Sequence, residues 1–176
     1  PRDVRLVQEH AVYAAMVEAM DLAVGKVLAK LDELGLAKNT IVIFTSDNGA
    51  EFFKPWDGWA GPWRGQYFTA LEGGIRVPFL VRWPGRISAG RVSNEIVHGV
   101  DMFATLAKFG GAKVPNGRPF DSLDQSDFLL GKTEKSAIEA IRVIDPYDKA
   151  DGPQGKRDIA VSRTIGEMTV FKDRTL

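Results

Sequence analysis

An acid and an amide, Asp47 and Asn48, stand next to each other where a short apolar segment ends, and Gly49 follows them directly. A carboxylate and an amide oxygen are hard ligands, of the kind that Ca²⁺ and Mg²⁺ prefer. Taken alone, Asp-Asn-Gly is also typical of a simple turn, because Asn-Gly is among the strongest turn dipeptides. The tripeptide by itself therefore leaves a metal site and a turn both open.

The segment that positions this tripeptide is residues 41–45, with the sequence IVIFT. Four large apolar residues in a row predict a strand covered on both faces, as in a parallel α/β sheet. In such sheets ligands bind beyond the carboxyl ends of the strands, which is where Asp47 and Asn48 stand. The position favours a binding site over a bare turn.

A long amphipathic helix is predicted over residues 3–34, with Asp3 as its N-cap and Gly35 as a left-handed residue at its end. Its apolar stripe recurs at steps of three and four and comprises Val17, Met20, Val24, Val27, Leu28, Leu31 and Leu34. This helix, a short connection and the buried strand predict the second half of a βαβ unit, and hence an α/β fold.

A loop over residues 50–71 is too long for a simple connector. Its aromatic residues are Phe52, Phe53, Trp56, Trp59, Trp63, Tyr67 and Phe68. They could form a wall for an aryl or otherwise apolar substrate, or they could pack the loop down. Beyond the loop, Glu72 and Arg76 are expected to organise the backbone around two glycines.

The later elements are predicted from shorter patterns. A strand is expected at residues 75–83 and an extended piece at 95–97. A helix over 102–109 should begin at Asp101 as its N-cap and end at two glycines. Further along the chain, we expect loop and turn with a buried patch at 128–130, and short strands at 159–161 and 168–171.

Composition limits the function classes. Of the 176 residues, 44% are hydrophobic, and Lys+Arg and Asp+Glu are equal at 23 each. A balanced charge gives no reason to expect a nucleic-acid partner or a membrane-surface partner. Cysteine is absent, which excludes disulfides, thiolate metal sites and a cysteine nucleophile, and leaves the cellular compartment open.

Three linked motifs make the chain recognisable: NTIVIFTSDNGAE, PWRGQYFTALEGGIRVPFLVRWPG and SNEIVHGVDMFATLAKFGG. In this order and spacing they resemble the later half of the type I sulfatases, the arylsulfatase family. The likeness implies an alkaline-phosphatase-like α/β fold, here partial, and a sulfuric ester hydrolase acting on small-molecule sulfate esters. We expect residues 1–131 to form the carboxyl-side part of the catalytic domain, with 132–176 as a small divergent appendage.

The resemblance also implies a metal site and a special nucleophile. Calcium, or magnesium, would be bound by Asp47 and Asn48 together with two Asp residues from an early strand of the family fold. The family's nucleophile is a formylglycine made within a Cys/Ser-x-Pro-x-Arg motif, which this chain lacks. We therefore expect no catalytic residue in this segment, no activity of the segment alone, and self-association through its uncovered faces.

One departure concerns the sulfate itself. Many sulfatases have a sulfate-binding Lys five residues before the Glu of Glu-Gly-Gly, and Tyr67 stands at that position. A phenol can donate a hydrogen bond but brings no positive charge. Arg64 or Lys54 could serve the anion instead, although each could equally be a solvated loop charge, or this branch prefers a different substrate.

Two other functions stay open at this point. Phosphodiesterases and phosphonate hydrolases of the same superfamily often have His where Asn48 stands, so the amide favours the sulfatase. A non-catalytic module that kept the fold and lost the site would also lack a nucleophile. The two histidines, His10 and His98, are expected to be structural, because neither has a partner at metal-ligand spacing.

Overall fold

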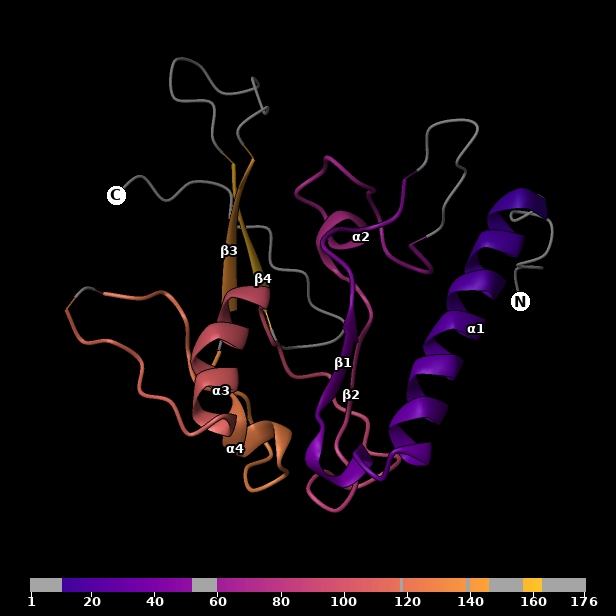
Figure 1. Cartoon of the computed structure of the whole chain (residues 1–176). Helices are drawn as coiled ribbons and strands as arrows, with labels where there is room; N and C mark the ends of the chain where they lie inside the picture. The colour runs from indigo at the N-terminus through magenta and orange to yellow at the C-terminus, as the bar shows by residue number, and fades with distance from the viewer. Residues whose placement is uncertain (1–10, 52–59, 118, 139, 146–156, 163–176) are drawn as a thin grey trace. The chain divides into compact units, whose positions relative to one another are not determined.

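The computed structural model describes residues 11–51, 60–117, 119–138, 140–145 and 157–162 (Figure 1). The chain divides into two compact units, Pro1–Pro84 and Gly85–Leu176. The first unit contains the candidate metal ligands, and each unit is described by itself.

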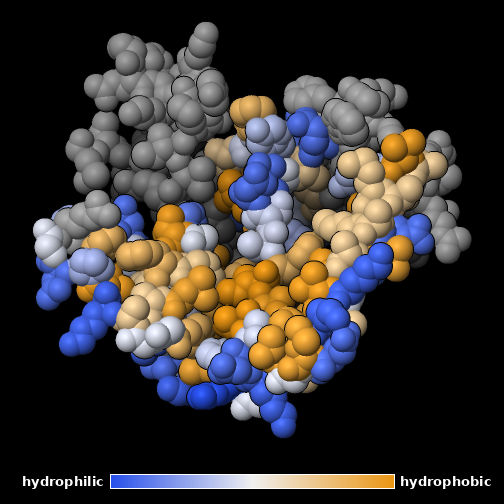
Figure 2. Space-filling view, viewed as in Figure 1, coloured by the Kyte–Doolittle hydropathy of each residue, from blue (hydrophilic) through white to orange (hydrophobic). Residues whose placement is uncertain are grey.

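The predicted amphipathic helix is present as α1, Ala11–Glu33. Its proposed N-cap lies outside the described residues, and Gly35, with φ of 68°, confirms the left-handed end. Part of the apolar stripe, Val24, Leu28 and Leu31, is half-buried, while most other apolar residues of α1 are exposed. Apolar side chains gather on the side of α1 that is turned to β1 and β2, and hydrophilic ones follow its outer edge (Figure 2). None of the described helices is long and apolar enough to cross a membrane.

The strand before the tripeptide is confirmed as β1, Val42–Thr45, which follows a single 3-10 turn, η2, Ala37–Asn39. Its partner is β2, Phe79–Arg82, and the two run antiparallel with Ile43 opposite Val81. The parallel pairing that we expected is therefore wrong for this pair. β1 is also only half-buried, with Thr45 exposed, so the burial on both faces that we expected is not seen in the described part of the chain. An unbroken apolar run does not encode the direction of the neighbouring strand.

The strand predicted at 75–83 is shorter than expected. Its first residue, Ile75, is the end of α2, Glu72–Ile75, a single helical turn whose Glu72, Gly73 and Gly74 are buried. The strand β2 begins only after Pro78, which lacks the N–H group that a ladder needs. The long loop and α2 thus bring the chain back beside the end of β1.

In the second unit, the helix predicted at 102–109 is confirmed as α3, Met102–Phe109, while no strand forms at 95–97. Asp101 does not cap α3 with its side chain. It closes a capping box with His98 around the preceding 3-10 turn, η3, Gly99–Asp101. The patch at 128–130 is buried as predicted for Phe128 and Leu129, but it lies in a short helix, α4, Ser126–Leu129, instead of a loop.

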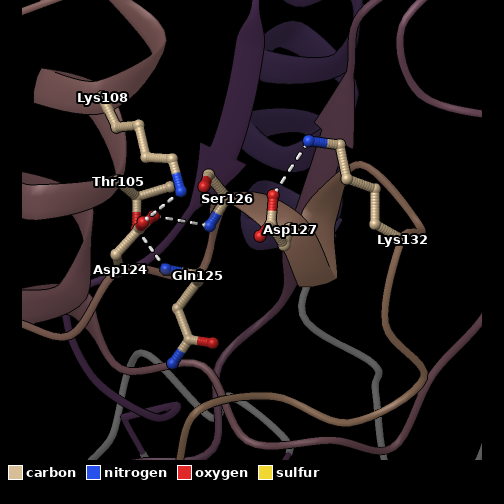
Figure 3. Close-up of polar contacts among 7 residues, drawn as sticks. All are labelled: Thr105, Lys108, Asp124, Gln125, Ser126, Asp127 and Lys132. Atoms are coloured by element: carbon tan, nitrogen blue, oxygen red, sulfur yellow. Dashed lines mark hydrogen bonds and ion pairs between the residues drawn. The ribbon is translucent and has the colours of Figure 1, made fainter.

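A buried polar cluster joins α3 to the segment before α4. Asp101, only 1% exposed, accepts hydrogen bonds from Leu123 N at 3.0 Å and from Gln125 Nε2 at 2.9 Å. Thr105 Oγ1 accepts from Gln125 N at 2.9 Å (Figure 3). At the rim of this cluster Lys108 Nζ lies 2.7 Å from Asp124 Oδ2. These bonds hold a segment without regular structure against a helix about twenty residues away in sequence.

A second hairpin was only half predicted. The strand expected at 159–161 is confirmed within β4, Arg157–Ser162, but its antiparallel partner β3, Ala140–Asp145, was missed. Its register places Val143 opposite Ile159. The strand expected at 168–171 lies outside the described residues.

Candidate metal and substrate site

The turn after β1 presents the two candidate metal ligands. Asp47 is exposed and accepts a hydrogen bond from Asn48 N at 3.0 Å through Oδ1. Asn48 is half-buried, and its amide nitrogen donates to Gly49 O at 3.0 Å. Because the amide N–H is used in this way, the orientation leaves the side-chain oxygen Oδ1 as the atom that can bind a cation.

The backbone behind these ligands is clamped to α2. Gly49 N donates to Gly74 O at 2.8 Å. A Cβ at Gly49 would lie 1.8 Å from Gly73 O, so only glycine permits this approach. The turn therefore has a glycine for close packing against a backbone carbonyl, and the Asp-Asn-Gly pattern does more than reverse the chain.

The candidate substrate residues are brought to the same place. Tyr67 N donates to Ala50 O at 2.9 Å, which fixes the loop beside the turn that carries the candidate ligands. Arg64 O accepts from Gly73 N at 2.7 Å, and the Arg64 side chain is exposed. These backbone contacts bring the main chain of Tyr67 close to the end of β1 and that of Arg64 to α2, while Lys54 lies outside the described residues.

Glu72 and Arg76 are structural, as we expected. They form an ion pair within α2, and Glu72 is buried. The Arg76 guanidinium also lies over the Trp63 ring, 4.1 Å from its centroid. Pairing with a carboxylate and stacking on an indole both stabilise a cation in place, so Arg76 anchors the aromatic loop to α2.

His98 has a backbone-capping role in the second unit. His98 Nδ1 accepts a hydrogen bond from Val100 N at 3.2 Å inside the capping box. That role is structural, as expected, and His10 lies outside the described residues.

Two features of the site were not predicted from the sequence. Glu51 Oε1 is buried, and no described residue donates a hydrogen bond to it. Phe68 adopts a left-handed backbone with φ of 65°. An apolar residue followed by Thr carries no pattern for this conformation, whereas an acid two residues after Gly49 was a visible signal that we did not use.

The donor set fits a hard divalent cation, but only as part of its coordination shell. Asp47 and Asn48 offer carboxylate and amide oxygens, and Ca²⁺ takes about six to eight such ligands. No group of three or more His, Cys, Asp or Glu residues that could hold a metal is found in the described part of the chain. Glu51 Oε1 is buried and has no hydrogen-bond partner among the described residues, which fits a site that further groups complete.

Comparisons with known proteins identify the family of this chain. A protein-family model described as Sulfatase matches residues 2–112. Steryl-sulfatase of Mus musculus is 46% identical over 136 residues, which are 74% of this chain and 22% of that protein. N-acetylgalactosamine-6-sulfatase of Rattus norvegicus is 43% identical over 120 residues, covering 67% of this chain and 23% of the relative.

Solved structures show the same relationship. The crystal structure of PsFucS1 sulfatase from Pseudoalteromonas sp. matches with a TM-score of 0.67 and 39% identity, over 74% of this chain and 26% of that one. Ps i-CgsB in complex with k-i-k-neocarrahexaose matches with a TM-score of 0.72 and 29% identity, over 80% of this chain and 31% of that one. The chain spans about a quarter of the length of these relatives. By the match of the family model and of these structures, it belongs to the sulfatase family, with a partial alkaline-phosphatase-like α/β fold.

Proposed function

We propose that the whole protein hydrolyses sulfate esters of small molecules, and that Asp47 and Asn48 bind its divalent cation, calcium or magnesium. The observation that carries the proposal is their position after β1, on a turn clamped to α2 by the bond from Gly49 N to Gly74 O. The membership of the chain in the sulfatase family supports the reaction.

The two ligands contribute differently. Asp47 supplies a full negative charge, while Asn48 supplies a neutral oxygen, so together they offset only part of the charge of a divalent ion. The cation, when bound, neutralises and orients sulfate oxygens. The rigid backbone behind Gly49 holds both side chains in position, which limits the reorganisation that binding requires.

On the substrate side, Arg64 and Tyr67 are the proposed contacts to the sulfate ester. The Tyr67 phenol can donate a hydrogen bond to a sulfate oxygen, and Arg64 brings the positive charge that Tyr67 lacks. The exposed Arg64 side chain is free of any ion pair in the described part of the chain and is therefore able to reach an anion.

We also propose that residues 1–131 belong to the catalytic domain and that 132–176 form a divergent segment. The family model ends at residue 112, and the second hairpin, β3 with β4, lies entirely beyond it.

The test uses the whole protein, purified with its metal, and p-nitrophenyl sulfate as substrate. Asp47→Asn keeps the size of the side chain but removes the charge, and we expect a loss of about a hundredfold or more in kcat/KM. Asp21→Asn on α1 is the matched control, since Asp21 is exposed and carries no ion pair among the described residues. The kcat/KM of Asp21→Asn should stay within about twofold of that of the unaltered protein.

Three outcomes would contradict the proposal. Equal activity of Asp47→Asn and the control would remove Asp47 from the metal site. Turnover of bis(p-nitrophenyl) phosphate without turnover of the sulfate would instead assign the protein to the phosphodiesterases, and absence of turnover of both would favour a non-catalytic module.

A further inference from the structure

Phe68 is the only non-glycine residue with a positive φ in the described part of the chain, at 65°. Bulky residues rarely adopt this conformation, because Cβ approaches the backbone carbonyl too closely. Strain of this kind persists only where the surrounding structure imposes it, and it is concentrated at functional sites.

The turn that imposes the strain is held at several points. Thr69 N and Thr69 Oγ1 both donate to Gln66 O, at 3.0 and 2.7 Å, and Tyr67 N donates to Ala50 O. The turn also lies directly on Gly74, where an added Cβ would be 2.2 Å from Thr69 O. The backbone on both sides of Phe68 is therefore fixed.

The position of this turn relates it to the candidate metal ligands. Gly74, on which the turn rests, accepts the hydrogen bond from Gly49 N. Gly49 follows Asn48 directly. The pair of Gly49 and Gly74 is therefore all that lies between the turn around Phe68 and the turn that carries Asp47 and Asn48. The backbone of Phe68 is thus linked through Gly74 and Gly49 to that turn.

Burial of the Phe68 side chain does not compensate for the backbone strain, because the residue is mostly exposed. Phe68 as a whole residue is 67% exposed, and its ring contacts the Tyr67 ring, with 4.1 Å between the centroids and 37° between the planes. A glycine would adopt the same backbone without strain. Neither the backbone nor packing within the described residues explains an aromatic side chain at this position.

We propose that Phe68 is a specificity residue that contacts the organic part of the sulfate ester and favours an alcohol with a flat, apolar ring. This inference rests on the proposed function. Phe has no hydrogen-bonding group, so it cannot bind the sulfate itself. Together with Tyr67 it offers two adjacent ring surfaces, which suit an aryl or polycyclic alcohol better than a sugar that needs several polar partners.

The first arm of the test compares two substrates with the whole protein. In Phe68→Leu, which keeps an apolar side chain but removes the ring, KM for p-nitrophenyl sulfate should rise about tenfold. KM for a galactose sulfate should change less than about twofold. Phe103→Leu is the matched control, because Phe103 is an exposed Phe on α3 in the other unit, and it should change neither value.

The second arm needs no turnover. Binding of p-nitrophenyl sulfate, followed by ligand-detected NMR, should weaken in Phe68→Leu and not in Phe103→Leu. The variant Phe68→Gly, which relieves the backbone, should melt at the same temperature as the unaltered protein or at a higher one.

The outcomes separate the two claims. An unaltered protein that binds the aryl sulfate through Phe68 but hydrolyses no sulfate would overturn the proposed function alone. An active protein in which Phe68→Leu affects both substrates equally, or neither, would overturn the specificity role. A clearly lower melting temperature of Phe68→Gly would show that another part of the protein packs on the ring, and would also overturn it.

Discussion

Gly49 and Gly74 are 25 residues apart, and the hydrogen bond of 2.8 Å from Gly49 N to Gly74 O joins the end of β1 to the turn that leads into β2. Together with the bond from Tyr67 N to Ala50 O, this contact places the candidate metal ligands, Tyr67 and α2 at one end of a two-stranded ribbon.

Gly49→Ala should destabilise the protein by about 3 kcal/mol, because the added Cβ would lie 1.8 Å from Gly73 O and the backbone must move apart. Gly25→Ala is the control: in α1 a Cβ meets no atom within 4 Å, and alanine should stabilise the helix by about 0.5–1 kcal/mol. Thermal unfolding of both variants measures the difference. Equal melting temperatures would show that the turn relaxes without cost.

Metal binding by this chain alone should be weak. Asp47 and Asn48 supply only one full charge, and no metal-binding cluster exists among the described residues. Calorimetric titration with Ca²⁺ should therefore give no tight binding, and p-nitrophenyl sulfate should not be hydrolysed. Tight binding that Asp47→Ala abolishes would mean that this chain holds a complete site.

The chain alone should also self-associate. Many apolar residues of α1 are exposed, among them Met16, Val17, Met20 and Val27. Contiguous apolar surface of this kind favours association. Light scattering over a range of concentrations should show the mean mass rising, and Met16→Lys combined with Met20→Glu should reduce that rise. A stable monomer at high concentration would contradict this prediction.

The buried carboxylate of Asp101 should be important for the stability of the second unit. Asp101→Ala would leave the N–H groups of His98, Leu123 and the Gln125 side chain without their acceptor. We expect a loss of about 3 kcal/mol or more, since each buried donor left unpaired costs about 1–3 kcal/mol. The exposed Asp121→Ala is the control. Faster hydrogen exchange at Leu123 N in the first variant only would locate the effect.

The pair of Lys108 and Asp124 gives a pH dependence with a definite sign. Burial opposes ionisation of Asp124, but hydrogen bonds from Lys108 and Ser126 outweigh it and lower the pKa of Asp124 below 3.8. The hydrogen bond to Asp124 raises the pKa of Lys108 above 10.5. The pair therefore makes its full contribution to the stability of the folded protein between pH 3.8 and pH 10.5. That contribution is lost as the pH falls through the folded pKa of Asp124, or rises through that of Lys108.

This prediction is checked with Lys108→Gln. Its melting temperature should lie below that of the unaltered protein near neutral pH, and the gap should close in acid below the folded pKa of Asp124. Lys135→Gln removes another exposed positive charge and should show no such pH-dependent gap. A gap that stays constant into strong acid would show that Lys108 stabilises the protein through something other than Asp124.

The local elements could be predicted because their signals are contained in neighbouring residues. The stripe of α1, the end of that helix at Gly35, the strand β1 and the helix α3 each follow from short-range spacing or a short apolar run. The family could be recognised for a related reason, since its motifs stand in order along the chain. Short-range patterns and family motifs are both contained in single segments of the sequence, so neither requires knowledge of long-range contacts.

Contacts between distant segments were decided only in the tertiary structure. The antiparallel direction of β2 and the donors Leu123 N and Gln125 Nε2 to Asp101 depend on groups that lie far away in sequence. The helical turn at Glu72 and the left-handed Phe68 had no signal in the residues around them. The tripeptide Asp-Asn-Gly determines which oxygen atoms are available to bind a cation at the end of β1. Whether those atoms form a site depends on what packs behind them, and there a backbone carbonyl 25 residues away accepts the N–H of Gly49.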